Sequence, residues 1–215
     1  MTLLVAGILL GIGVPNVMEF SRNASMTAAA NDFVTDMLAA RTEAVKRQAP
    51  VTLCLSDNPT DPNPACVAGT VSDSATRGFV VFVDENNNFD ADGARIVDAT
   101  DGNGVIDAGE LVLRQTAAPG ASSNVRVSSS CGHFSFASTG YMRAIAAQPC
   151  ITPKLMLFCD DRGRRRAAGD LSSARIVRIP SAGRAQVLSE VAQVNTLNGL
   201  LNSPLQHNVP TTCPP

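Results

Sequence analysis

An uncharged apolar stretch, TLLVAGILLGIGVP (residues 2–15), runs directly into a segment without glycine or proline, residues 16–49. Together they are typical of one helix that is kinked at Pro15, where proline removes a hydrogen bond, and that ends before Pro50. At 1.5 Å per residue this helix is about 70 Å long. No ordinary compact domain begins in this way, so the sequence indicates a helix that serves in assembly.

The second part of the helix is amphipathic. Apolar side chains recur at helical spacing on one face, and charged side chains occupy the opposite face. We expect the apolar face to pack on a β-sheet, whereas the apolar first part favours lipid or other helices. The apolar members are Phe33, Met37, Ala40 and Ala44, flanked by Val34, Leu38 and Val45, and the charged members are Asp32, Asp36, Arg41, Glu43, Lys46 and Arg47.

Beyond residue 50 the pattern changes to short β-branched and aromatic runs separated by glycine, proline, asparagine and aspartate. The predicted fold class is therefore α+β, with a long kinked N-terminal helix packed on an antiparallel β-sheet domain. The predicted strands are 51–55, 79–83, 111–113, 125–127, 134–136, 155–158, 174–179 and 185–188.

The composition argues against several classes of function. The chain has no tryptophan, one tyrosine and two histidines, which disfavours base or sugar recognition by stacking and leaves little for zinc or histidine-based catalysis. The sequence shows no nucleophile elbow, phosphate-binding loop or paired carboxylates in an apolar setting. We predict a protein that is not an enzyme and has no small-molecule substrate.

The order of motifs resembles the GspH/FimT-type pseudopilins and minor pilins of the type IV pilin superfamily. The resemblance extends from residue 1 to about residue 190. After the apolar run come, in the family's order, AANDFVTDMLAARTEAVKRQAPVTLC (29–54), GFVVFVD (78–84), IDAGELVLR (106–114) and ARIVRIPSAGRAQV (174–187).

This resemblance implies a structural protein that assembles with other pseudopilins or pilins into a type II secretion pseudopilus or a type IV pilus. Before assembly it would cross the bacterial inner membrane once, with its globular domain in the periplasm. The implied assembly residues are Leu3, Leu4, Ile8, Leu9 and Pro15. The implied division is 1–21 for the membrane or filament-core part of the helix, 22–50 for the amphipathic part, 51–189 for the β-rich domain and 190–215 for a C-terminal extension.

Members of this family begin with a short basic leader ending in glycine, followed by phenylalanine, a few apolar residues and a glutamate. Prepilin peptidase cuts after the glycine, and the new N-terminus is methylated. Aligned on Gly7 and Pro15, the mature start would lie about two helical turns upstream of Met1. We therefore expect a misassigned or truncated start. The missing residues would lengthen an apolar run that is shorter than the ~20 residues of a spanning helix.

The cysteines suit an oxidising compartment, and six of them allow fifteen pairings. We expect a Cys54–Cys66 disulfide, because the loop between them lacks core-forming residues. Closing it would contribute about 3 kcal/mol. The alternative is that some cysteines are buried thiols. Cys131 and His133 are not expected to form a catalytic pair. The other cysteines are Cys150, Cys159 and Cys213.

The middle of the chain is acidic, since residues 57–110 carry eleven acidic and two basic side chains. Calcium takes six to eight oxygen ligands, and two stretches offer them. Counted back from Glu110 as position twelve, the second stretch follows the EF-hand pattern without its first ligand, because Ala99 falls at position one. The alternative is a solvated loop rich in turn formers. The candidate ligands are Asp84, Asn86, Asn88, Asp90, Asp92, Asp101, Asn103, Asp107 and Glu110.

The end of the chain is basic, and clustered arginines favour phosphate by charge and geometry. The resemblance, which includes DNA-binding minor pilins, makes a pilus-borne DNA receptor acting in DNA uptake the second hypothesis. The alternative for this cluster is a solvated loop or a surface that meets acidic neighbours. A third hypothesis is a membrane-anchored or secreted domain of unknown activity. The candidate DNA-binding residues are Arg162, Arg164, Arg165, Arg166 and Arg184.

Overall fold

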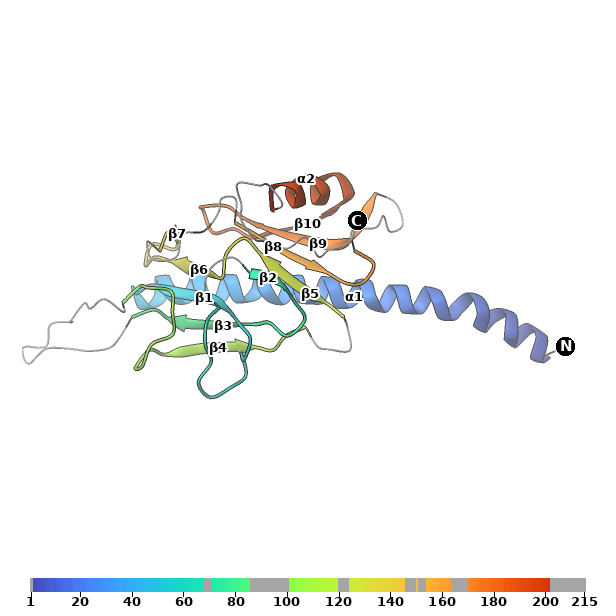
Figure 1. Cartoon of the computed structure of the whole chain (residues 1–215), viewed down its shortest axis with the longest axis horizontal. Coiled ribbons are helices and arrows are strands. Elements are labelled where there is room, and N and C mark those ends of the chain that lie inside the picture. Colours follow the sequence, from blue (N-terminus) through green and yellow to red (C-terminus); the bar gives the residue numbers. More distant parts are fainter. Residues whose placement is uncertain are drawn as a thin grey trace, which may run out of the picture.

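The computed structural model describes residues 2–67, 71–85, 101–119, 124–145, 150, 154–163 and 170–201. It opens with one helix, α1 (Thr2–Arg47), which is continuous through Pro15. Lys46 and Arg47 lie in its last turn, where they complement the helix dipole. Gln48 follows with a positive φ of 56°, the left-handed conformation that commonly ends a helix. Figure 1 shows α1 running between the two groups of strands and extending past them toward its N-terminus.

The strands form two antiparallel five-stranded sheets on either side of α1 (Figure 1). The first sheet has the order β4-β3-β1-β6-β7, and the second has the order β10-β9-β8-β5-β2. The first contains β1 (Val51–Ser56), β3 (Gly78–Val83), β4 (Val112–Thr116), β6 (His133–Phe136) and β7 (Met142–Arg143). The second contains β2 (Val71–Ser74), β5 (Arg126–Ser129), β8 (Lys154–Cys159), β9 (Leu171–Ile179) and β10 (Gln186–Glu190), and α2 (Val191–Leu201) follows.

The α+β class is confirmed, and every predicted strand overlaps an observed one. The division into two sheets was not predicted, because local patterns do not tell which strands pair. Strands β2 and β7 were also missed. The sequence of β2 is VSDS and β7 has two residues, so neither carries an apolar run long enough to detect.

Phe33 of α1 is the centre of the core. It is fully buried, and its ring centroid lies 5.1 Å from that of Phe79, 5.5 Å from that of Phe134 and 6.1 Å from that of Phe158. Phe79 and Phe134 belong to the first sheet and Phe158 to the second. Phe33 therefore joins both sheets to the helix. Met37, Ala40 and Ala44 are also buried, which confirms the predicted apolar face.

Asp36 corrects the predicted polar face of α1. Its side chain is completely buried, and its carboxylate forms a salt bridge with the guanidinium of Arg114 on β4. Burial raises the pKa of this carboxyl, with Arg114 opposing the rise. The sequence prediction was wrong because β4, an edge strand of the first sheet, places Arg114 beside this side of the helix. Conversely, Leu38 and Val45, which were expected beside the apolar face, are 50% and 44% exposed.

Helix α2 covers the outer face of the second sheet. Val194 is fully buried there with Leu157 and Ile176, and Leu197 packs against the same cluster. The second sheet is therefore covered on both faces, by α1 inside and by α2 outside. The start of α2 also contacts the start of β9, because the Val191 N–H donates to the carbonyl of Asp170, the residue before β9.

Replacing Phe33 tests the core directly. We expect Phe33→Ala to lower the free energy of unfolding by about 3–5 kcal/mol, because it leaves a cavity between both sheets and the helix. The control is Leu38→Ala on the exposed side of the same helix, expected to change it by less than ~0.5 kcal/mol. Urea unfolding of the full chain in detergent measures both. Equal losses in the two variants would contradict this description of the core.

Candidate functional site

The part of α1 nearest its N-terminus exposes large apolar side chains. Val17 is 66%, Met18 54% and Phe20 74% exposed, although they occupy neighbouring positions of one helix. Monomeric soluble proteins rarely leave such a group uncovered. The predicted assembly residues Leu3, Leu4, Ile8, Leu9 and Pro15 precede this group in α1, and their side chains lie outside the described part, so their role stays a prediction. No helix of the described residues combines the length and hydropathy that crossing a membrane requires.

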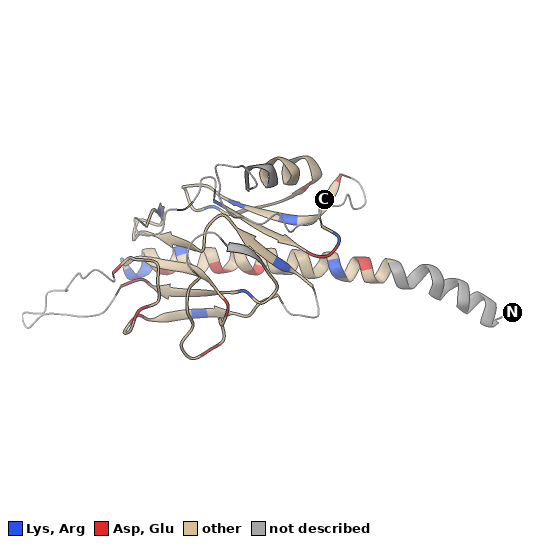
Figure 2. Ribbon diagram, viewed as in Figure 1, with Lys and Arg blue, Asp and Glu red and all other residues tan. Residues whose placement is uncertain are grey.

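The structure brings several predicted calcium ligands together at the end of β3. Asp84 follows β3 and is buried, and its carboxylate accepts hydrogen bonds from Thr52 Oγ1 at 2.7 Å and from the Gly104 N–H at 3.1 Å. In the loop before β4, Asn103 Nδ2 donates to Asp107 Oδ2 at 2.6 Å. The Asp107 N–H donates to Glu110 Oε2 at 2.9 Å. Figure 2 shows acidic positions, in red, in loops near the C-terminal end of α1.

Glu110 is the most perturbed of these carboxyls. Burial, followed by repulsion from Asp84, Asp107 and Asp101, raises its pKa to about 8, against the opposing hydrogen bond from the Asp107 backbone. Burial also raises the pKa of Asp84. Oε1 of Glu110 is buried without a hydrogen-bond partner. A bound cation would relieve this repulsion, and calcium binding stays a prediction. The candidate ligands Asn86, Asn88, Asp90 and Asp92 lie outside the described residues.

The predicted DNA-binding arginines do not form one described surface. Arg162 forms a salt bridge with Asp160, in which Nη2 lies 2.7 Å from Oδ2. Nη1 of Arg162 also donates a hydrogen bond to Oδ1 of Asn23 on α1 at 2.9 Å. Arg162 therefore fastens the β8–β9 loop to the helix. Arg184 is exposed in the turn before β10. Arg164, Arg165 and Arg166 lie outside the described residues, so DNA binding stays a hypothesis.

The predicted Cys54–Cys66 disulfide is confirmed. Cys54 lies on the outer face of the first sheet, with Val80 and Phe82, and Cys66 packs against this cluster. The bond therefore holds the loop after β1 against the sheet. This loop contains few apolar groups of its own, which is why the pairing was accessible from the sequence.

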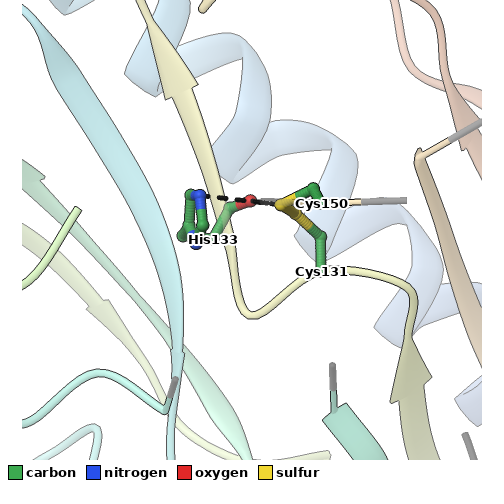
Figure 3. A group of neighbouring side chains, drawn as sticks. All are labelled: Cys131, His133 and Cys150. Atoms are coloured by element: carbon green, nitrogen blue, oxygen red, sulfur yellow. Dashed lines mark hydrogen bonds between the residues drawn. A yellow bond between two sulfur atoms is a disulfide. The ribbon is translucent and has the colours of Figure 1, made fainter. Parts of the chain in front are cut away.

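A second disulfide, Cys131–Cys150, was not predicted, and it lies beside His133 (Figure 3). Cys131 and His133 are two residues apart, a spacing that places side chains on the same side of an extended chain. That spacing was the signal in the sequence that Cys131 and His133 lie close together. The pairing of Cys131 with Cys150 could not be predicted, because six cysteines allow fifteen pairings. His133 Nε2 lies 3.6 Å from Cys150 Sγ.

Comparison with known proteins identifies the family. A family model described as Type II transport protein GspH matches residues 29–183. The chain therefore belongs to the GspH family of minor pseudopilins and minor pilins, as the sequence resemblance predicted.

Two crystal forms of the type IV minor pilin FimU from Pseudomonas aeruginosa are similar in structure. One is 16% identical with a TM-score of 0.47 and covers 79% of this chain and 92% of its own. The other is 15% identical with a TM-score of 0.42 and covers 75% and 91%. No curated protein matches the chain.

The raised pKa of Glu110 makes stability depend on pH. Between its ordinary value of 4.5 and about 8 the folded protein holds a proton that the unfolded chain releases. The free energy of unfolding therefore falls as pH rises through this window. We expect Glu110→Gln to reduce this loss of stability at high pH, because the amide stays neutral. Its oxygen can still accept the hydrogen bond from the Asp107 N–H.

Urea unfolding at pH 5 and pH 9 in the presence of a chelator measures the difference between variant and parent. Glu43→Gln is the control, because Arg47 lowers the pKa of Glu43 and its removal cannot produce a gain at high pH. A Glu110→Gln variant that gains nothing at pH 9 would contradict the raised pKa.

Calcium is expected to raise the melting temperature of the parent more at pH 8 than at pH 5, because it binds the ionised carboxylates. Glu110→Gln should lose most of the effect. Calorimetric titration of the full chain checks the binding itself. The absence of heat at millimolar calcium and pH 8 would remove the calcium hypothesis.

Proposed function

We propose that this protein is a structural minor pseudopilin or minor pilin that assembles through α1 into a type II secretion pseudopilus or a type IV pilus. The observation that carries the proposal is the exposed apolar group Val17, Met18 and Phe20, on a helix whose other half is the core of the β domain. Membership of the GspH family supports the same assignment.

The energetics favour burial of this part of α1 against other helices. Covering a phenylalanine side chain completely contributes about 1.5–3 kcal/mol. Phe20 is 74% exposed, and its neighbours Val17 and Met18 are more than half exposed. A single chain in water therefore does not gain most of this burial free energy. Packing beside the corresponding helices of related subunits would recover it. The apolar residues that precede this group would extend the same contact.

We place the protein in the bacterial inner membrane before assembly, with the β domain in the periplasm. The two disulfides support this location, because such bonds persist in oxidising compartments. Other pilins or pseudopilins are the proposed partners. Processing by a prepilin peptidase and methylation of the new N-terminus belong to the same proposal.

Photo-crosslinking in the native bacterium tests the assembly contact. A photoreactive residue at position 20 of the full chain should give crosslinked products with another copy or with other pilins in isolated filaments, because Phe20 is proposed to lie in the helical core. Position 193, exposed on α2, is the matched control. Equal yields at both positions, or products at position 193 alone, would contradict assembly through α1.

A further inference from the structure

Cys131, His133 and Cys150 form a compact group of metal-ligating atoms. The two sulfurs and a ring nitrogen all lie within 4.8 Å of one another. Cys131 is fully buried, His133 is 2% exposed and Cys150 is half-buried. In Figure 3 the imidazole of His133 points its Nε2 toward the sulfur of Cys150. In the oxidised protein, the disulfide joins both sulfurs.

The distances suit a shared metal ion once the disulfide is opened. Metal–sulfur bonds near 2.3 Å and metal–nitrogen bonds near 2.0 Å that meet at tetrahedral or trigonal angles place the two ligand atoms about 3.5–3.7 Å apart. The observed Cys150 Sγ–His133 Nε2 distance is 3.6 Å. The Cα atoms of Cys131 and Cys150 are 5.1 Å apart. Rotation of the Cys131 side chain can therefore bring its sulfur to a similar distance from His133 Nε2.

The surroundings bury the imidazole and hold it in place. His133 pairs with Cys54 in the ladder between β6 and β1, which fixes its backbone. Gly104 lies beside the ring, because a Cβ at this position would be in van der Waals contact with two ring carbons at 3.6 Å. Gly104 has a φ of +78° and is itself held by Asp84. The ligand position of His133 is therefore built by three separate segments of the chain.

We propose that the dithiol form of this protein binds one thiophilic d¹⁰ cation, Cu(I) or Zn(II), through Cys131, His133 and Cys150. Two thiolates and an imidazole are the ligands that these ions favour. Three ligands complete a trigonal Cu(I) site, whereas Zn(II) would add one water as the fourth ligand. The same two sulfurs thus serve either as a covalent link or as a metal site.

A dithiol reductant breaks the S–S bond and supplies two electrons and two protons, so that two thiols form and the reductant becomes a disulfide. The cation then displaces the two thiol protons to solvent and binds both thiolates and the neutral imidazole. Oxidation of the dithiol by a disulfide-donating oxidant, before the metal binds, restores the Cys131–Cys150 bond.

Metal titration of the reduced full chain in detergent, without oxygen, tests the proposal. Cu(I) is added against a colorimetric copper(I) chelator and Zn(II) against a zinc indicator. One equivalent of at least one ion should bind to the reduced protein and none to the oxidised protein. His133→Gln should weaken binding about tenfold or more. Cys131→Ser/Cys150→Ser should abolish it.

The Cys54–Cys66 pair provides the matched control, because it is also a disulfide of the first sheet and can be reduced together with the other. Cys54→Ser/Cys66→Ser should bind the metal as the parent does. If the Cys131→Ser/Cys150→Ser variant does not fold, His133→Gln decides the outcome, since it keeps both thiols. The proposal is overturned if the reduced parent binds neither ion, if His133→Gln binds equally well, or if binding is lost with Cys54 and Cys66.

Discussion

The packing of Phe33 between Phe79, Phe134 and Phe158 joins α1 to both sheets. Neither sheet could bury its inner face without the helix, because the core side chains of both meet on the same stripe of α1. The β domain therefore cannot release the second half of α1 without losing its core.

Polar contacts add to this packing at two places along α1. Toward the N-terminal side, Arg162 donates a hydrogen bond to Asn23. Nη1 of Arg22 lies 3.6 Å from Oδ1 of Asp161, so both contacts hold the β8–β9 loop against the helix. Further along, Asp36 pairs with Arg114 of the edge strand β4. The pair Arg22–Asp161 is exposed and contributes little, whereas the buried Asp36 would be costly without its partner. On the N-terminal side of these contacts, Val17, Met18 and Phe20 are exposed.

The sequence predicted those features that depend on local spacing. The recurrence of Phe33, Met37 and Ala44 defined the buried face, and the loop between Cys54 and Cys66 indicated their disulfide. Features that depend on distant segments were missed. Burial of Asp36 depends on β4, and the Cys131–Cys150 pair depends on the fold bringing together two residues that are 19 positions apart. The acidic cluster was predicted as residues in a loop, but the raised pKa of Glu110 follows first from its burial and then from repulsion by Asp84, and only the fold produces both.

The central claim is that one helix serves both as the core of the domain and as the contact of the filament. Its most direct measurement compares the parent and Phe20→Asp in sheared filament and membrane fractions from the native bacterium. The account predicts that the parent enters filaments, whereas Phe20→Asp keeps its disulfides and folded domain but stays in the membrane fraction. Entry of the Phe20→Asp variant into filaments at the level of the parent would contradict it.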